Sequence, residues 1–238
     1  MIVRLVLGSI ALVGAVTGAM PADAASRNFG VTSFDRIRVE GPYKVRLSTG
    51  VAPFASASGS PAALDRVAVE VHGRTLVVRA SRSSWSGYPG RDPGPVEIRL
   101  GTHELTAASL TGAGALSIDR VKGLTFGLSV HGSGVAGIEQ VNVDQLDVSV
   151  AGTASATLTG RTGKMTAVVR GISSLDAASL VAKDATIGAD GAATVKANVS
   201  NAVKVDGSGP ATITFAGRPA CTLRVSSSAS VSGCKSTQ

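Results

Sequence analysis

Large aromatic side chains are scarce in this 238-residue chain: Phe, Tyr and Trp together make up 3% of it, and charged residues only 16%. Gly, Ala, Ser, Thr and Val are abundant instead. Aromatic residues supply much of the buried area in a conventional globular core, so such a core is hard to build from this composition. A narrow interior of stacked Val, Ile, Leu and Ala suits the sequence better.

Long apolar runs are also missing beyond the N-terminus, where no segment approaches the roughly 20 apolar residues that span a bilayer. The N-terminal run, Leu5–Val16, is itself too short, and it follows a basic start at Arg4. Ala22-Asp23-Ala24 then supplies the small residues of a cleavage site. This is the layout of a secretory signal peptide, and we expect residues 1–24 to be one, cleaved after Ala24.

The mature chain is therefore expected to comprise residues 25–238 and to be exported to the periplasm or the cell surface, without a transmembrane segment. No cysteine lies near the cleavage site, which excludes a lipid-modified N-terminal cysteine. Export also argues against nucleic acid as a partner. The basic residues point the same way, because they are scattered along strands and do not cluster beside aromatic rings that could stack on bases.

Cysteine is limited to Cys221 and Cys234. Two thiols without a nearby His or further Cys are too few ligands for a metal site. Their even number and the oxidising compartment reached by export favour a disulfide, which would tie together the last repeat of the chain. The prediction fails if the two strands diverge and leave the Cα atoms more than about 7 Å apart.

The formal net charge of +7 is distributed unevenly along the chain. Residues 26–103 hold eleven Lys or Arg against six acidic residues, whereas residues 104–238 hold eleven against nine. A basic N-terminal half favours contact with an anionic envelope surface or a polyanionic glycan.

From Leu110 onward the sequence repeats a Gly-rich phrase that can be aligned by eye. Examples are Leu110-Thr111-Gly112-Ala113-Gly114 and Val130-His131-Gly132-Ser133-Gly134. The aligned positions are 112, 132, 152, 171, 189, 207 and 227. A nearly fixed period of this length, built of strand-like phrases, indicates a stacked solenoid. The glycines fit sharp corners between strands, and a nucleotide-binding loop is excluded because it would open one helix per domain.

Apolar and polar residues alternate within each repeat, which is typical of half-buried strands. Apolar residues recur four and six positions after the corner in six successive repeats, and these two positions should form two interior ladders. The pairs are Leu116 and Ile118, Ala136 and Ile138, Ala156 and Leu158, Leu175 and Ala177, Ala193 and Val195, and Ala211 and Ile213. A third short side is suggested by Val121, Val141, Leu180 and Val199. The sequence therefore predicts an all-β, single-stranded parallel β-helix, or β-solenoid, with about 18–20 residues in each coil.

The regular coils should span 110–234, preceded by a strand-rich but less regular region, 26–110, that forms either wider coils with excursions or a small packed sheet. Three phrases stand out here, Phe34-Asp35-Arg36-Ile37-Arg38-Val39, Gly41-Pro42-Tyr43-Lys44-Val45 and Arg74-Thr75-Leu76-Val77-Val78. With the Gly-Ser-Gly repeats, they resemble the head GIN-domain family of "putative autotransporter adhesins". The resemblance implies a right-handed parallel β-helix, export across the inner membrane and an adhesin-like role.

Carboxylates are the first candidates for catalytic groups. Asp119 and Glu139 share one position in adjacent repeats and could approach the separation of about 5 to 9.5 Å that glycosidases use. The next repeats place Thr159 and Ala178 there, so no further catalytic partner is stacked nearby. We expect this pair to lie on a solvated outer face.

Histidines and serines offer no better catalytic pattern. His72, His103 and His131 lack the spacing of a metal site, and the Gly-Ser-Gly phrases are too short and sit between two strands, not at a strand-to-helix elbow. No cofactor and no enzymatic activity are expected.

One segment, residues 81–95, differs from the rest in its aromatic content. It contains the only Trp, Trp85, together with Tyr88, Arg82 and Arg91. Aromatic rings beside arginines could contact a glycan or a lipid headgroup. The interpretation we favour is that Trp85 covers an edge of the solenoid, and both alternatives stay open.

The sequence as a whole favours an exported, non-enzymatic binding or adhesin-like module of the cell envelope, with a glycan or an anionic envelope surface as partner. A polysaccharide-active enzyme is the alternative, and a structural envelope protein without a discrete ligand is the second.

Overall fold

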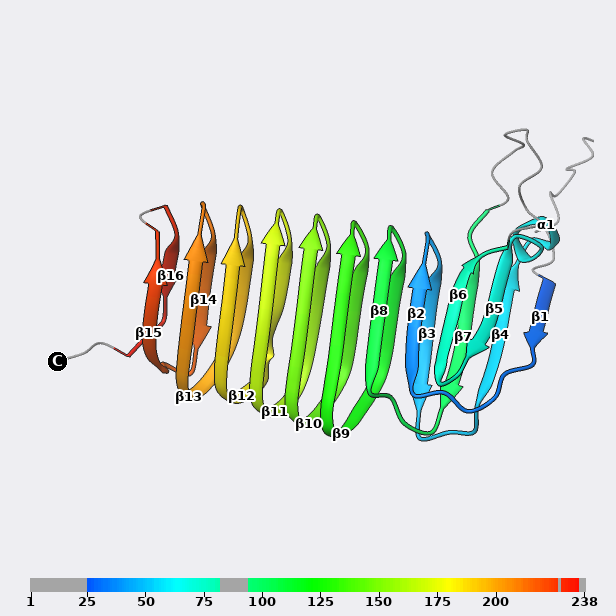
Figure 1. The fold of residues 1–238 in the computed structure, drawn as a ribbon, viewed down its shortest axis with the longest axis horizontal. Coiled ribbons are helices and arrows are strands. Elements are labelled where there is room, and N and C mark those ends of the chain that lie inside the picture. Colours follow the sequence, from blue (N-terminus) through cyan, green and yellow to red (C-terminus); the bar gives the residue numbers. More distant parts are fainter. Residues whose placement is uncertain (1–24, 82–93, 227, 236–238) are drawn as a thin grey trace, which may run out of the picture.

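A single coiled sheet of 16 strands makes up most of the described protein (Figure 1). The computed structural model describes residues 25–81, 94–226 and 228–235. Within these residues there is one short helix, α1 (Pro61–Leu64), and no helix long and apolar enough to span a membrane. The predicted signal peptide, residues 1–24, lies outside the described residues.

Five long parallel strands form the regular part of the solenoid, β9 (Ala115–Gly132), β10 (Val135–Gly152), β11 (Ser155–Gly171), β12 (Ser174–Asp190) and β13 (Thr194–Ser208). Each bends midway and so contributes to two faces. Val135 lies opposite both Ala115 and Ser155, and Thr212 lies opposite Thr194 in a slightly shorter coil. The predicted parallel β-solenoid is therefore confirmed, and its period follows from the pairing register.

Two faces enclose the interior. Face A consists of the C-terminal halves of β9–β13 together with β2 (Arg36–Glu40), β8 (Ala107–Gly112) and β15 (Ala220–Val225). Face B consists of the N-terminal halves with β3 (Lys44–Thr49), β14 (Thr212–Ala216) and β16 (Ser230–Ser232). In Figure 1 the chain runs upward along face A in front, crosses to face B behind it, and shifts to the left with each coil. The coil is therefore right-handed.

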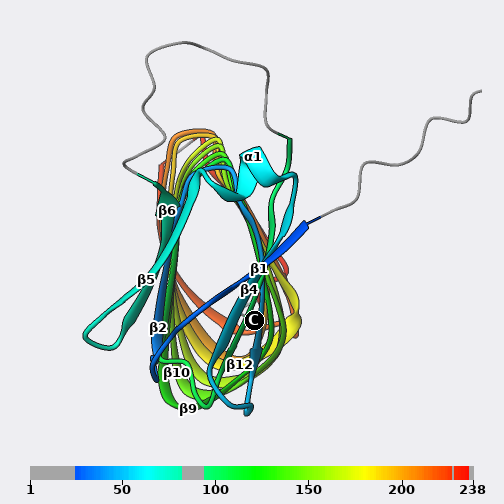
Figure 2. The same ribbon diagram turned by 90° about the vertical axis from the view of Figure 1, so that its right-hand side faces the viewer.

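The N-terminal end of the solenoid is built differently. After β3 the chain leaves the regular path and returns at β8, having formed β4 (Phe54–Gly59), β5 (Val67–His72), β6 (Thr75–Ala80) and β7 (Glu97–Thr102). On face A, β6 is parallel to β2 and β5 is antiparallel to β6; on face B, β7 is parallel to β3. Beyond β7, β4 and β1 (Ala25–Phe29) are antiparallel additions to face B. The same two faces thus continue through the less regular region and end in reversed strands, with α1 at this end (Figure 2).

The interior is filled by the apolar residues that alternate along each strand. All twelve predicted ladder residues are at most 2% exposed, and so are Val121, Val141, Leu180 and Val199 at the broad bend opposite the glycine corners. Most of their outward neighbours in the strands are polar or small, and Val135 and Val181 are exposed exceptions. The narrow interior of mostly aliphatic side chains is what the low aromatic content predicts.

The register of the last coils differs from the sequence alignment by two residues. The alignment puts corners at positions 189 and 207, but Gly191 is the residue that approaches Gly171, and Gly209 approaches Gly191. Val195 consequently lies opposite Leu175 and Ile213, not opposite Ala177. The coil shortens at the broad bend, where the register of β12 against β13 shifts after Ala177. All predicted interior residues remain buried because a shift of two keeps the side-chain parity of a strand.

Glycine is required at the corners because successive coils come too close for a side chain. Gly152 has φ +96°, and a Cβ there would lie 2.5 Å from the carbonyl oxygen of Gly132. Both the positive φ and the close approach exclude other residues without a backbone shift.

A disulfide joins Cys221 to Cys234, with Cα atoms 5.7 Å apart, as predicted. Cys221 belongs to β15 on face A, and Cys234 follows β16 on face B. The amide of Lys235 also donates to the carbonyl of Pro219 at 2.9 Å. These contacts connect the two faces in the last described coil.

Replacing Gly152 with Ala should lower stability by about 2 kcal/mol or more, because the new Cβ strains the corner. The matched control is Gly137→Ala in the same strand, where φ is not positive and nothing lies within 4 Å of the added Cβ. We expect this control to change stability by less than about 0.5 kcal/mol. Urea unfolding midpoints of the purified protein measure both effects, and equal midpoints for the two variants would contradict the corner argument.

Removing the disulfide by Cys221→Ser and Cys234→Ser together should destabilise the protein by about 3 kcal/mol, since the bridge closes a loop between positions 13 residues apart. Mass spectrometry of the alkylated, unreduced wild-type protein should find no labelled cysteine. Two labelled cysteines would show that the bridge does not form in the cell.

Candidate functional site

A shallow, open hollow with a volume of about 510 Å³ lies on the outer surface of face A. It crosses β2, β8, β9, β10 and β11 near the N-terminal end of the solenoid. Two further hollows lie along face A toward the C-terminus, one of them between Arg170 and Arg224. The face thus offers a series of recesses along the direction in which the coils stack.

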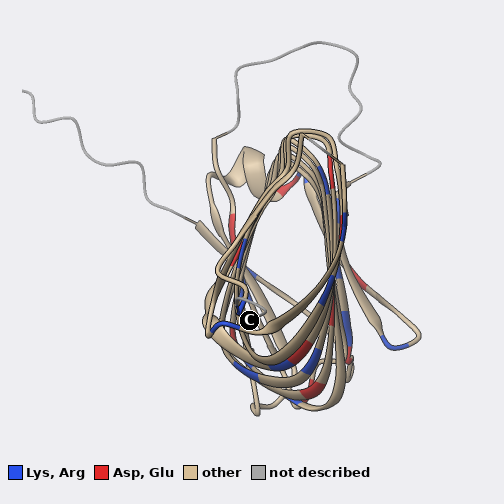
Figure 3. Cartoon of the chain, turned by 90° about the vertical axis from the view of Figure 1, so that its left-hand side faces the viewer, with Lys and Arg blue, Asp and Glu red and all other residues tan. Residues whose placement is uncertain are grey.

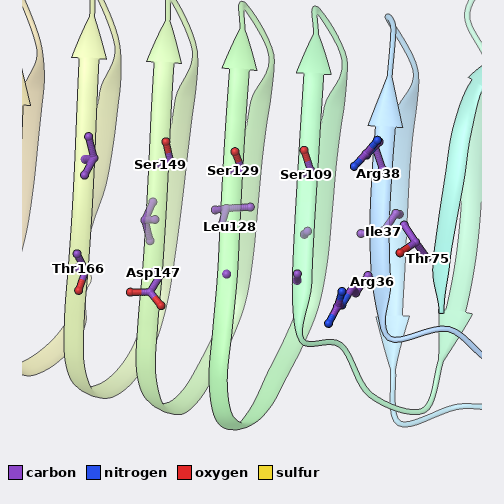
Figure 4. A pocket seen from close by; sticks show the side chains of 15 residues that line it. Arg36, Ile37, Arg38, Thr75, Ser109, Leu128, Ser129, Asp147, Ser149 and Thr166 are labelled. Atoms are coloured by element: carbon purple, nitrogen blue, oxygen red, sulfur yellow. The ribbon is translucent and has the colours of Figure 1, made fainter. Parts of the chain in front are cut away.

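The floor of this hollow is formed by two rows of small outward residues. Pairing register aligns Ser109, Ser129 and Ser149 in one row, which Figure 4 shows at the same height on β8, β9 and β10. Ala107 and Gly127 precede them in a second row, which ends at Asp147. Adjacent strands are about 4.8 Å apart, so each row repeats at that interval. The hollow exists because neither row carries a large side chain until Asp147.

The N-terminal end of the hollow is basic. Arg36 and Arg38, two outward residues of β2, both extend toward β8 in Figure 4. No acidic group in the described part of the chain lies within ion-pair distance of Arg36. Arg38 is 4.0 Å from Glu40, and both side chains are largely exposed, so this pair contributes little. The two guanidinium groups are therefore accessible to a ligand.

Other arginines nearby already have acidic partners. Arg74 contacts Asp35 at 2.6 Å, and Arg79 contacts Glu70 at 2.9 Å. Hydrogen bonds from Arg79 and then from His72 lower the pKa of the Glu70 carboxyl. Figure 3 shows the resulting mixture of basic and acidic segments along the face A side. Arg79 is paired within the hairpin of β5 and β6 and Arg74 is paired with acidic groups outside it, which leaves Arg36 and Arg38 as the accessible basic pair at the hollow.

The predicted carboxylate pair lies elsewhere. Asp119 and Glu139 occupy equivalent positions on β9 and β10, as the repeat predicts. However, Asp119 accepts hydrogen bonds from the backbone amide and the hydroxyl of Thr49, at 3.0 and 3.4 Å, and so connects β9 to the end of β3. Glu139 is exposed, and neither carboxylate lines a hollow of face A. This arrangement explains Asp119 as a structural residue.

The three histidines are dispersed and exposed. His72 contacts Glu70, His131 contacts the hydroxyl of Ser129 at 2.8 Å, and His103 lies after β7. Among residues 25–81, 94–226 and 228–235, no three His, Cys, Asp or Glu side chains come together as potential metal ligands.

The aromatic segment predicted as a possible contact lies mostly outside the described residues, and this includes Arg82, Trp85, Tyr88 and Arg91. Its neighbour in sequence, β6, contributes Thr75 to the hollow.

Sequence reasoning missed the hollow itself. The serine row carried a usable signal, because Ser109, Ser129 and Ser149 each stand three positions before a corner glycine. The basic end carried none, since Arg36 and Ala107 are distant in sequence and become neighbours only because β2 pairs with β8.

These observations define a right-handed parallel β-solenoid with a recessed outer face and no recognisable catalytic constellation in its described part. The family model described as "Putative auto-transporter adhesin, head GIN domain" matches residues 33–219. The chain therefore belongs to this family, as its repeats suggested.

Solved structures confirm the fold. A structure described as a putative adhesin from Bacteroides fragilis has a TM-score of 0.77 at 16% identity, covering 90% of this chain and 99% of that one. Another, described as a putative lipid binding protein from Parabacteroides distasonis, has a TM-score of 0.69 at 18% identity, covering 88% and 96%. No curated protein matches the chain. At such low identities the likeness concerns the fold alone.

Proposed function

We propose that this protein is an exported, non-enzymatic binding module of the cell envelope, adhesin-like in role, and that face A is its contact surface. The observation that carries the proposal is the hollow across β2, β8, β9, β10 and β11, with accessible arginines at one end and hydroxyl groups along its floor. Such a surface can donate and accept hydrogen bonds along an extended ligand. A glycan or another anionic component of the envelope fits its chemistry.

Export is part of the same proposal. The N-terminal sequence has the layout of a signal peptide, and a disulfide persists in the oxidising compartments that such a signal leads to. The adhesin description of the family supports a location in the periplasm or at the cell surface. The name of the Parabacteroides protein makes lipid headgroups a class worth including in any binding test.

Blocking the hollow should abolish binding while leaving the fold intact. Ser129→Trp places a large ring on the floor of face A, whereas Ser117→Trp places the same ring on face B of the same strand, β9. On a glycan and lipid array we expect Ser129→Trp to weaken the binding of every ligand that the wild type binds by about tenfold or more. Ser117→Trp should have little effect on the same binding. If both variants bind as the wild type does, face A is not the contact surface.

Replacing Trp85 and Tyr88 together with Ala distinguishes the two roles considered for the aromatic segment. If the rings cover an edge of the solenoid, the thermal unfolding midpoint falls and binding is retained by the folded protein; this is the result we expect. If they contact the ligand, binding weakens and the midpoint does not change. Array binding and thermal unfolding measured on one preparation separate these outcomes.

A further inference from the structure

We propose that the hollow at the N-terminal end of face A selects an oligosaccharide with a single anionic group, a carboxylate, sulfate or phosphate, held at one end by Arg36 and Arg38. The inference rests on the proposed function of face A and specifies the ligand class that this face accepts.

The two arginines are suited to one compact anion. They stand two positions apart on β2, so their side chains leave the same side of the strand, and both reach toward β8. Each guanidinium offers several N–H donors in a planar fork that matches carboxylate, sulfate or phosphate oxygens. Charge-assisted hydrogen bonds of this kind are about twice as strong as neutral ones.

The floor beyond the arginines offers neutral hydrogen bonding. The side-chain hydroxyls of Ser109 and Ser149 have no hydrogen-bond partner among the described residues, and the hydroxyl of Ser129 contacts His131. Hydroxyl groups both donate and accept, as the hydroxyls of a sugar do. Ala107 and Gly127 leave room beside this row for the body of a sugar ring.

Asp147 limits the charge that the ligand can carry. Three strand spacings separate it from Arg36, across β8 and β9, which is about 14 Å. Its carboxylate can accept from sugar hydroxyls but repels a second anionic group at that distance along the hollow. The hollow is therefore suited to an oligosaccharide that is charged at the arginine end and neutral at the Asp147 end, and it disfavours a uniformly charged polyanion.

The test compares neutral lactose with three charged derivatives, 3′-sialyllactose, 3′-sulfolactose and lactose phosphate, by chemical-shift titration of the oxidised mature protein. At least one charged derivative should bind about tenfold or more tightly than lactose, since losing a charge-assisted pair costs that factor. Shift changes should involve β2 and β8 to β10. If none of the three binds more tightly than lactose, the proposal is overturned.

The critical variant is Arg36→Gln with Arg38→Gln, which should reduce the affinity for the charged derivative to that for lactose. The matched control removes two exposed positive charges from face B, Lys44→Gln with Lys196→Gln. We expect this control to bind within about twofold of the wild type. An equal loss in both double variants would show attraction by net charge alone and would overturn the proposal.

A third readout separates this inference from the proposed function. Vesicles of phosphatidylglycerol in phosphatidylcholine that bind through Arg36 and Arg38, without binding of any charged sugar, would show a membrane ligand and refute the oligosaccharide. In that case face A remains the contact surface. Equal binding of lactose and its charged derivatives, blocked by Ser129→Trp, would likewise refute only the anionic selection. No difference between Ser129→Trp and Ser117→Trp would refute the proposed function itself.

Discussion

Main-chain hydrogen bonding between successive coils is the constraint on which the rest of this structure depends. It places each residue opposite its equivalent one coil away, about 4.8 Å distant, as the register of β9 against β10 shows. Any property of one coil is thereby repeated as a row. Interior rows are apolar and mostly aliphatic, because the two faces enclose only a narrow space between them. Corner rows must be glycine, because backbone meets backbone there.

The same constraint shapes the outer surface. A recess can form on a β-solenoid where successive coils place small residues in two adjacent rows, and face A does so at Ser109, Ser129 and Ser149 and again at Ala107 and Gly127. Face B has one such row, Ser117, Gly137 and Thr157, but the rows on both sides of it contain larger exposed residues, Val135 and Glu139. Binding capacity in this fold is therefore a property of rows across the strands. A single motif along the chain does not encode it.

The two ends of the solenoid differ in structure. At the N-terminal end, reversed strands and α1 adjoin the first coils, so the parallel hydrogen-bonding pattern is interrupted. At the last described coil, the disulfide between Cys221 and Cys234 links the two faces. The excursion that forms the N-terminal end also places β2 beside β8, and so brings the basic pair Arg36 and Arg38 to the hollow. Closure of the end and construction of the site thus follow from one topological feature.

The local and periodic features of this protein could be predicted from its sequence. Alternation predicted which residues are buried, the glycine phrases predicted the coil, and the two cysteines predicted their bridge. The alignment of the repeats was wrong by two residues at positions 189 and 207. The phrase Gly188-Ala189-Asp190-Gly191 fits a corner whether the corner is placed at residue 189 or at residue 191. Only the pairing of β12 with β13 shows that the coil becomes shorter at the broad bend. The hollow could not be predicted, because it depends on which strands pair in the folded chain. Its basic end joins residues 36 and 107, and no local pattern records which strands will become neighbours after an excursion of this length.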